Sequence, residues 1–322
     1  MIGKFVTTMA AASCAMLLAA LPAGAQTYPD QPVTILVGVN PGGGTDTIAR
    51  RLAKALQDKW GKPVLVENRA GADGTIASSL VKARRPDGYT LLLTNNGFTL
   101  SPMNMKVEYD PIKDFSPVTQ IGQTPLVLAA NPSLNASDGK SLIKALKAKP
   151  GEYSAGASGS ANSTFNAMEQ LRARAEVDIT TIPYKGAAAM VTALVAGEVQ
   201  LGFSNLIGIY PFLESNGGGL KPIAVTSSKR ASKIPDVPTM EEALGLDKFE
   251  IWNAWYGLLA PRGVDPAILS KIQTDVLDVM HSPELQKAFE AEGLDVIGST
   301  PDEFKAVLEN HVKLYAQVFQ PK

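Results

Sequence analysis

The chain of 322 residues has few of the residues that bind metals or carry out nucleophilic chemistry, with two histidines and one cysteine. The cysteine, Cys14, lies in an apolar N-terminal segment, and His281 and His311 lie near the C-terminus. A structural zinc site needs four such ligands, and a disulfide needs two cysteines. We therefore expect no metal site, no disulfide and no cysteine nucleophile.

An excess of charge of one sign is also lacking, because 30 Lys and Arg residues oppose 31 Asp and Glu residues. Nucleic acids and anionic membrane surfaces attract proteins that carry a basic surplus. The composition therefore indicates no nucleic-acid partner and no binding to a membrane surface.

Long apolar runs are confined to the N-terminus, which reads MIGKFVTTMAAASCAMLLAALPAGAQ. Lys4 precedes an apolar stretch that is short for a spanning helix, and small residues follow it up to Ala25. This pattern is typical of a secretory signal peptide. We predict that residues 1–25 are removed and that residues 26–322 form the exported protein, which is long enough for two domains.

Strand and helix patterns alternate through most of the remaining chain. Strands are expected at 33–39, 63–67, 90–94, 153–156, 180–184, 199–203, 221–226 and 254–259. Helices are expected at 45–60, 75–84, 139–149, 162–175, 187–196, 206–215, 265–280, 283–292 and 301–317. Such alternation favours parallel sheets covered by helices.

Two extended crossings interrupt the alternation. The first follows Asp114, where Gly122 separates two extended segments, and the second is a proline-rich segment before the strand at 254–259. We predict an α/β fold of two lobes, each a mainly parallel sheet flanked by helices, joined by a two-strand hinge. The predicted boundaries are 26–123 for the first part of lobe 1, 124–227 for lobe 2, and 228–322 for the return to lobe 1 with the C-terminal helices. A single large sheet is the alternative.

The stretch NPGGGTDT, residues 40–47, joins the first predicted strand to the first predicted helix. Glycines leave backbone N–H groups uncovered, and the first N–H groups of a helix lack internal partners and carry partial positive charge. A loop of this kind favours an anion, such as a carboxylate or a pyrophosphate. We interpret Asp46 as a helix-start residue that organises these donors. A tight turn without a ligand is the alternative.

Four more polar loops follow predicted strands, at 94–99, 155–164, 183–186 and 203–208. Ligands of open α/β sheets bind beyond the carboxyl ends of the strands, so we expect these loops to line a cleft between the lobes. The predicted ligand-binding residues are Gly43, Gly44, Thr45, Asp46, Asn95, Asn96, Ser158, Ser160, Asn162, Thr164, Phe165, Tyr184, Ser204 and Asn205. The pattern shows no catalytic residue and indicates no cofactor.

Two enzymatic motifs are approached but incomplete. Gly42 and Gly44 match two glycines of the dinucleotide fingerprint, but Thr47 occupies the third position. The stretch GASGS places Ser158 as the nucleophile of a G-x-S-x-G elbow, but Ser160 replaces the final glycine. An exported serine hydrolase that uses Ser158 is kept as an alternative function.

Several stretches in the same order resemble the extracytoplasmic solute receptors of tripartite tricarboxylate transporters, the TctC or Bug receptors. They are YPDQPVTILVGVNPGGGTDTIARRLAKAL, VENRAGADGTIAS, PDGYTLLLTNN, YDPIKDFSPVTQIG, IPYKGAAAMVTALVAGEVQLGFSN and WYGLLAPRGV. The resemblance implies a two-lobed periplasmic binding protein that captures a carboxylate for a membrane permease. We expect the protein to be a monomer. In the family the ligand carboxylate often lies against the loops that correspond to 42–47 and 158–164. A carboxylate sensor without a permease is the remaining alternative.

Two departures from the family pattern concern the ligand. Phe165 occupies a position where members commonly have histidine, and Ser204 one where many have an aspartate that can pair with an amino group. We therefore expect a monocarboxylate or dicarboxylate without an amino group, such as the aromatic terephthalate, with Phe165 and Phe98 as an aromatic face. A place for Phe165 in the core is the alternative. Lys185 is either a cationic partner of the ligand or a surface residue.

Overall fold

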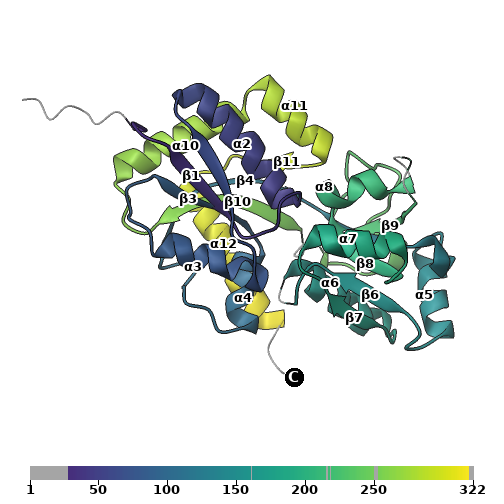
Figure 1. Cartoon of the computed structure of the whole chain (residues 1–322). Helices are drawn as coiled ribbons and strands as arrows, with labels where there is room; N and C mark the ends of the chain where they lie inside the picture. The colour runs from purple at the N-terminus through teal and green to yellow at the C-terminus, as the bar shows by residue number, and fades with distance from the viewer. Residues whose placement is uncertain (1–27, 161, 215–216, 218, 250–252, 319–322) are drawn as a thin grey trace, which may run out of the picture. The chain divides into compact units, whose positions relative to one another are not determined.

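The structure is a computed structural model, which describes residues 28–160, 162–214, 217, 219–249 and 253–318 (Figure 1). The predicted signal peptide, residues 1–25, lies outside the described residues. The chain divides into two compact units, 1–30 and 31–322, and the helices and strands of the structure lie in the second unit. None of the helices among the described residues has the length and apolarity needed to cross a membrane.

Six strands form the first sheet, in the order β11-β4-β10-β3-β1-β2. Their bounds are β1 Val33–Val37, β2 Val64–Asn68, β3 Thr90–Asn95, β4 Phe115–Thr124, β10 Ala254–Pro261 and β11 Asp295–Val296. β1 pairs in parallel with β2 and β3, whereas β10 pairs antiparallel with β3 and β4. Every residue of β10 is buried, because this strand lies in the middle of the sheet.

Two groups of helices cover this sheet on opposite faces (Figure 1). The first group is α2 Gly44–Trp60, α10 Pro266–Met280 and α11 Pro283–Glu292, and the second is α3 Thr75–Lys82, α4 Gly97–Asn104 and α12 Pro301–Val318. In α2, Ile48, Leu52 and Leu56 recur at helical spacing and are fully buried. The helix ends at Gly61, whose φ of 62° is the left-handed conformation that favours glycine.

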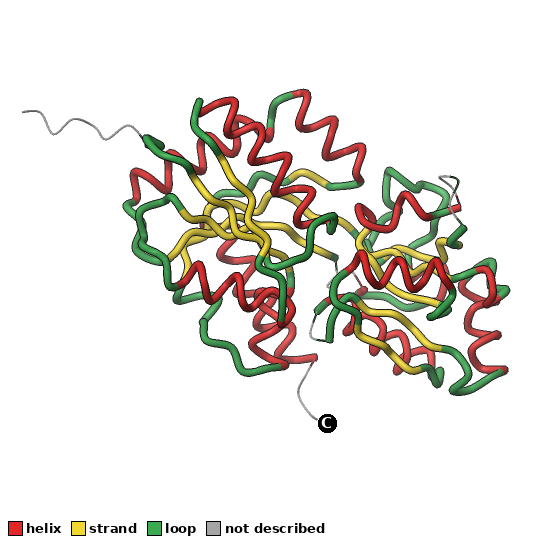
Figure 2. The backbone as a smooth tube through the Cα atoms, viewed as in Figure 1, coloured by secondary structure: helices red, strands yellow, loops and turns green. Residues whose placement is uncertain are grey.

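Five strands form the second sheet, in the order β7-β6-β8-β5-β9. Their bounds are β5 Leu126–Ala130, β6 Ser154–Ala157, β7 Thr180–Pro183, β8 Leu201–Asn205 and β9 Lys221–Val225. The helices α5 Gly139–Ala148, α6 Ser163–Ala175, α7 Ala187–Ala196 and α8 Leu206–Ile209 accompany it. Figure 2 shows the two sheets, each flanked by helices.

The predicted two-lobed α/β fold is confirmed, and the pairing within each sheet is mixed. Within the alternating pattern of strands and helices, β1 with β2 and β3, and β6 with β7 and β8, pair in parallel, as predicted. The strands that enter or leave a crossing between the lobes, β4, β5 and β10, pair antiparallel with their neighbours. The expected break at Gly122 is wrong, because β4 runs through it to Thr124. A Cβ atom at Gly122 would lie 2.5 Å from the carbonyl oxygen of Asp295, so the glycine admits the edge strand β11.

The two crossings between the lobes are bonded to each other. β4 passes into β5 at Pro125, and the second crossing returns into β10 after Asn253. The hydroxyl of Thr226 donates to Asn253 Oδ1 at 2.8 Å and accepts from the N–H of Leu126 at 2.9 Å. Thr226 therefore ties both crossings together.

The return to the first lobe begins later than residue 228. Ile234 and Val237 pack in the apolar core of the second lobe with Val127 and Met190, and α9, Met240–Leu244, lies beside β9. The segment 228–249 therefore packs on the second sheet, contrary to the boundary expected from the sequence. The other predicted boundary, between 123 and 124, stays a prediction.

Candidate functional site

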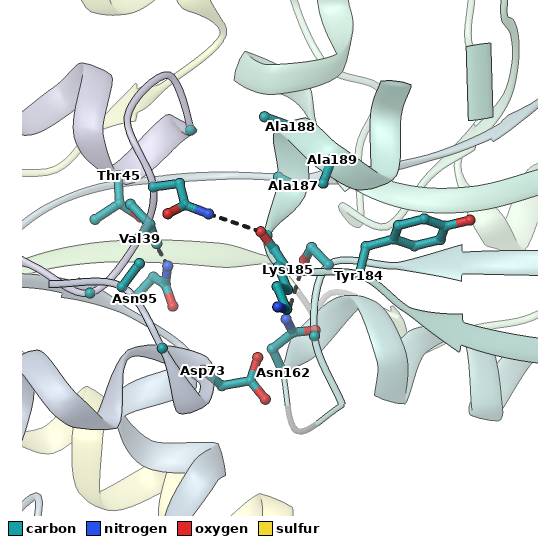
Figure 3. Close-up of a pocket in the computed structure, with 18 of the residues that line it drawn as sticks. Val39, Thr45, Asp73, Asn95, Asn162, Tyr184, Lys185, Ala187, Ala188 and Ala189 are labelled. Carbon is teal, nitrogen blue, oxygen red and sulfur yellow. Dashed lines mark hydrogen bonds between the residues drawn. The ribbon is translucent and has the colours of Figure 1, made fainter. Parts of the chain in front are cut away.

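The five polar loops named from the sequence meet at one cavity of about 810 Å³ (Figure 3). The first lobe contributes the segment after β1, the start of α2, the loop after β2 and Asn95 at the end of β3, and the second lobe contributes the loops after β6, β7 and β8. The lining is Gly38, Val39, Asn40, Gly43, Gly44, Thr45, Ala70, Gly71, Ala72, Asp73, Asn95, Met105, Ser158, Gly159, Ser160, Asn162, Pro183, Tyr184, Lys185, Gly186, Ala187, Ala188, Ala189 and Asn205.

The start of α2 presents backbone donors to this cavity. Gly43 is the residue before the helix, and without a side chain it leaves the first N–H groups of α2 uncapped. Gly44 is also needed for space, because a Cβ atom there would lie 2.9 Å from the Tyr256 hydroxyl and 3.0 Å from Asn205 Oδ1. Thr45 Oγ1 accepts a hydrogen bond from Asn95 Nδ2 at 2.9 Å, which joins the first two polar loops.

Asp46 holds the glycine loop in place through hydrogen bonds. The residue is 2% exposed, and its carboxylate accepts hydrogen bonds from Gly42 N, Arg50 Nε and Asn68 Nδ2 at 3.0, 2.9 and 2.8 Å. Burial by itself would raise the pKa of Asp46, but these hydrogen bonds outweigh it and hold the pKa below its usual value. Asp46 therefore stays charged and fixes the loop without lining the cavity.

The start of α7 faces the same cavity from the second lobe. Gly186 precedes the helix with a φ of 101°, and Ala187, Ala188 and Ala189 line the cavity. As with Gly43, the glycine has no side chain to cap the helix, so the first N–H groups keep their partial positive charge. Two helix starts without a side-chain cap, one from each lobe, thus face the same cavity.

The loop after β6 is closed on itself. Asn162 caps α6 by accepting from the N–H groups of Thr164 and Phe165, and the Thr164 hydroxyl is 2.9 Å from the Ser158 hydroxyl.

Both histidines lie among the described residues, but neither is a partner of Ser158. His311 accepts from Trp255 Nε1 at 2.8 Å, and His281 is exposed after α10. Among the described residues, Ser158 therefore has no histidine beside it to act as the general base of a hydrolase elbow.

Nine of the predicted ligand-binding residues line the cavity, namely Gly43, Gly44, Thr45, Asn95, Ser158, Ser160, Asn162, Tyr184 and Asn205. Their contact with a ligand stays a prediction. Five do not line it: Asp46, Asn96, Thr164, Phe165 and Ser204. Asn96 instead donates to the Asn253 carbonyl and accepts from the Trp255 N–H, while Thr164 and Ser204 are buried.

The aromatic face expected from the sequence does not form. Phe98 is 2% exposed and stacks on Tyr109 in the core of the first lobe, because α4 begins at Gly97 where a loop was expected. Phe165 lies outside the cavity lining on α6. The rings cannot flank a ligand together from these positions.

Sequence reasoning missed the loop after β2. Residues Ala70 to Asp73 line the cavity, and Asp73 is its one acid among the described lining residues, as Lys185 is its one base. The signal was present in the stretch RAGADG, in which glycines flank an acid directly after a strand. Among the described residues, we also find no group of three or more His, Cys, Asp or Glu residues able to hold a metal ion.

Comparison with known proteins identifies the family. The family described as tripartite tricarboxylate transporter family receptor, TctC, matches residues 48–321. Protein BugT of Bordetella pertussis is 35% identical over 98% of this chain and 94% of its own length.

Two solved structures are similar to this chain in both fold and amino-acid sequence. The periplasmic binding protein BugD is 30% identical with a TM-score of 0.85, covering 91% of this chain and 97% of BugD. A protein of R. palustris solved with adipate has the same identity and TM-score over 90% of this chain and 97% of its own. These relatives are solute receptors rather than enzymes, and the chain belongs to the TctC family of tripartite tricarboxylate transporter receptors.

Proposed function

We propose that the protein is a periplasmic receptor that binds a small carboxylate between its lobes and delivers it to the permease of a tripartite tricarboxylate transporter. The observation that carries the proposal is the convergence of two uncapped helix starts, at Gly43 and Gly186, on one cavity. Relatives support it, since one was solved with adipate and another, 27% identical, with malate.

The geometry favours a ligand with two carboxylates. Each helix start supplies unpaired N–H groups and partial positive charge, which stabilise an anionic group placed next to them. The two starts belong to opposite lobes, so a dicarboxylate that bridges them makes its full set of contacts only when the lobes are together. Binding and closure are then the same event.

The energy of such contacts is sufficient for a receptor. Micromolar affinity corresponds to about −8 kcal/mol, and a hydrogen bond to a charged group contributes about 1.5 to 3 kcal/mol. Four to six such bonds, shared between the two helix starts and the hydroxyls of Thr45 and Ser158, leave a margin for the cost of ordering.

Terephthalate remains a proposed ligand as a dicarboxylate rather than as an aromatic compound. Phe165 and Phe98 do not favour an aromatic ligand, because neither ring lines the cavity. Its two carboxylates still match two anion-binding helix starts. It therefore belongs in the ligand panel beside aliphatic dicarboxylates.

Calorimetric titration of residues 26–322 with aliphatic and aromatic carboxylates tests the proposal, and the bound compound is recovered and checked for chemical change. We expect at least one dicarboxylate to bind and to be recovered intact. Absence of binding by every carboxylate, or conversion of the ligand, would refute the receptor proposal. A cell that carries the receptor but lacks the permease genes distinguishes transport from sensing by uptake of the same compound.

A further inference from the structure

We infer that Asp73 selects the ligand: the cavity prefers a carboxylate whose carbon chain also carries a hydrogen-bond donor, a hydroxyl or an ammonium group. The inference rests on the proposed carboxylate-binding function and adds the chemistry of the ligand's middle section.

The loop that carries Asp73 has an unusual backbone. Gly71, Ala72, Asp73 and Gly74 have φ values of 136°, 45°, 52° and 90°, so four consecutive residues have positive φ. A non-glycine residue with positive φ costs free energy, and such residues cluster at functional sites where the surrounding structure holds them. Asp and Asn tolerate this conformation better than other side chains.

Three glycines from other segments make room for this loop. A Cβ atom at Gly38 would lie 2.5 Å from the Cα atom of Gly74, and one at Gly97 would lie 2.8 Å from the Asp73 carbonyl oxygen. A Cβ atom at Gly159, in the second lobe, would lie 1.8 Å from Asp73 Oδ1. The backbone of Asp73 is therefore held in the first lobe while its carboxylate reaches the second.

Figure 3 shows the Asp73 side chain extending from the first lobe toward Asn162. The carboxylate is thus held at the cavity wall, and Lys185 is the other charged residue among the described residues of the lining. A carboxylate has about four acceptor sites, so it can accept from a ligand in addition to the protein.

An acid in an anion-binding cavity has a consequence for selectivity. It repels a ligand carboxylate that comes near it, and it favours a donor at the same place. The two helix starts hold the ends of a dicarboxylate, which leaves the substituents of the chain between them to meet Asp73. Hydrogen bonds to a charged group imply a preference of about 10-fold to 100-fold for the ligand with the donor.

The test uses three dicarboxylates with one carbon skeleton: succinate, L-malate and L-aspartate. Calorimetry on residues 26–322 compares wild type with Asp73→Asn, which keeps the size and the tolerance for positive φ but removes the charge. Asp58→Asn is the matched control, because Asp58 is an exposed acid on α2 paired with Lys54. If only longer ligands bind, the same comparison is made with glutarate, 2-hydroxyglutarate and glutamate.

We expect malate or aspartate to bind wild type and Asp58→Asn about 10-fold or more tighter than succinate. Asp73→Asn should abolish a preference for the ammonium ligand and keep part of a preference for the hydroxyl ligand, because an amide oxygen still accepts. Gly159→Ala should reduce the same preference, because its Cβ atom displaces the carboxylate while the acid remains in the chain. Equal affinity for all three ligands, or a preference that survives Asp73→Asn unchanged, would overturn the role of Asp73 alone. Failure of every carboxylate to bind would overturn the receptor proposal with it.

Discussion

Acid should destabilise this protein through His311, on the C-terminal helix α12. Burial lowers the pKa of His311 from 6.5 to about 4. Its Nδ1 atom accepts a hydrogen bond from Trp255 Nε1 at 2.8 Å and lies 3.1 Å from the Tyr315 hydroxyl. A proton added to Nδ1 would point at the indole N–H, so the folded state holds the neutral ring.

The sign and size of the effect follow from linkage. Between pH 4 and 6.5 the unfolded chain binds a proton at His311 that the folded chain does not. The contribution of His311 to the free energy of unfolding is therefore fully present above pH 6.5 and is lost as the pH drops toward 4. At about pH 4.5, a lowering of this size corresponds to a loss of about 2 kcal/mol relative to neutral pH.

Urea unfolding followed by circular dichroism, at about pH 7.5 and about pH 4.5, measures this loss. Carboxyl groups also titrate in this range, so the quantity of interest is the difference between wild type and His311→Gln, which cannot take up the proton. The loss should be smaller in the variant by about 2 kcal/mol, whereas His281→Gln, at an exposed histidine, should lose as much as wild type. An equal loss in wild type and His311→Gln would refute the reasoning.

Three further predictions concern the cavity and the crossings. Gly44→Val should lower carboxylate affinity about 100-fold or more in calorimetry, because the side chain meets Tyr256 and Asn205 and covers the donors of α2; unchanged affinity would remove Gly44 from the site. Asn96→Ala should lower the free energy of unfolding in urea by about 3 kcal/mol, since it leaves the buried backbone N–H of Trp255 unpaired. A loss under about 1 kcal/mol would contradict that explanation. Lys185→Ala should weaken binding less than about fivefold and reduce its salt dependence, because this exposed charge is screened; a far larger loss would indicate direct contact with the ligand.

The sequence predicted the sheets better than the exact roles of single side chains. Strands and helices with strong periodicity, such as α2, could be placed within a residue or two. The convergence of the five loops followed from a general property of α/β sheets. Ser204 and Asn96 look like ligand donors in the sequence because both follow strands, yet neighbouring segments cover them, and only the fold reveals which segments these are.

Asp73 and Phe98 show the two ways in which local reasoning failed. Phe98 belongs to α4, a short helix that contains Pro102 and has no clear amphipathic pattern, so its inward orientation depends on packing against Tyr109 and Phe115. Asp73 reaches the cavity through a backbone of positive φ, which residue type alone indicates weakly outside glycine. Both positions are set by contacts with segments distant in the chain.

The hydrogen bonds of Thr226 link the two crossings and so limit how the lobes can turn against each other. Thr226 is bonded to Leu126 in one crossing and to Asn253 in the other, so a turn of one lobe against the other that keeps both hydrogen bonds moves the two connections together. A ligand that touches both helix starts then fixes the angle of that turn by its own length. Solutes of different length would then hold the lobes at different angles.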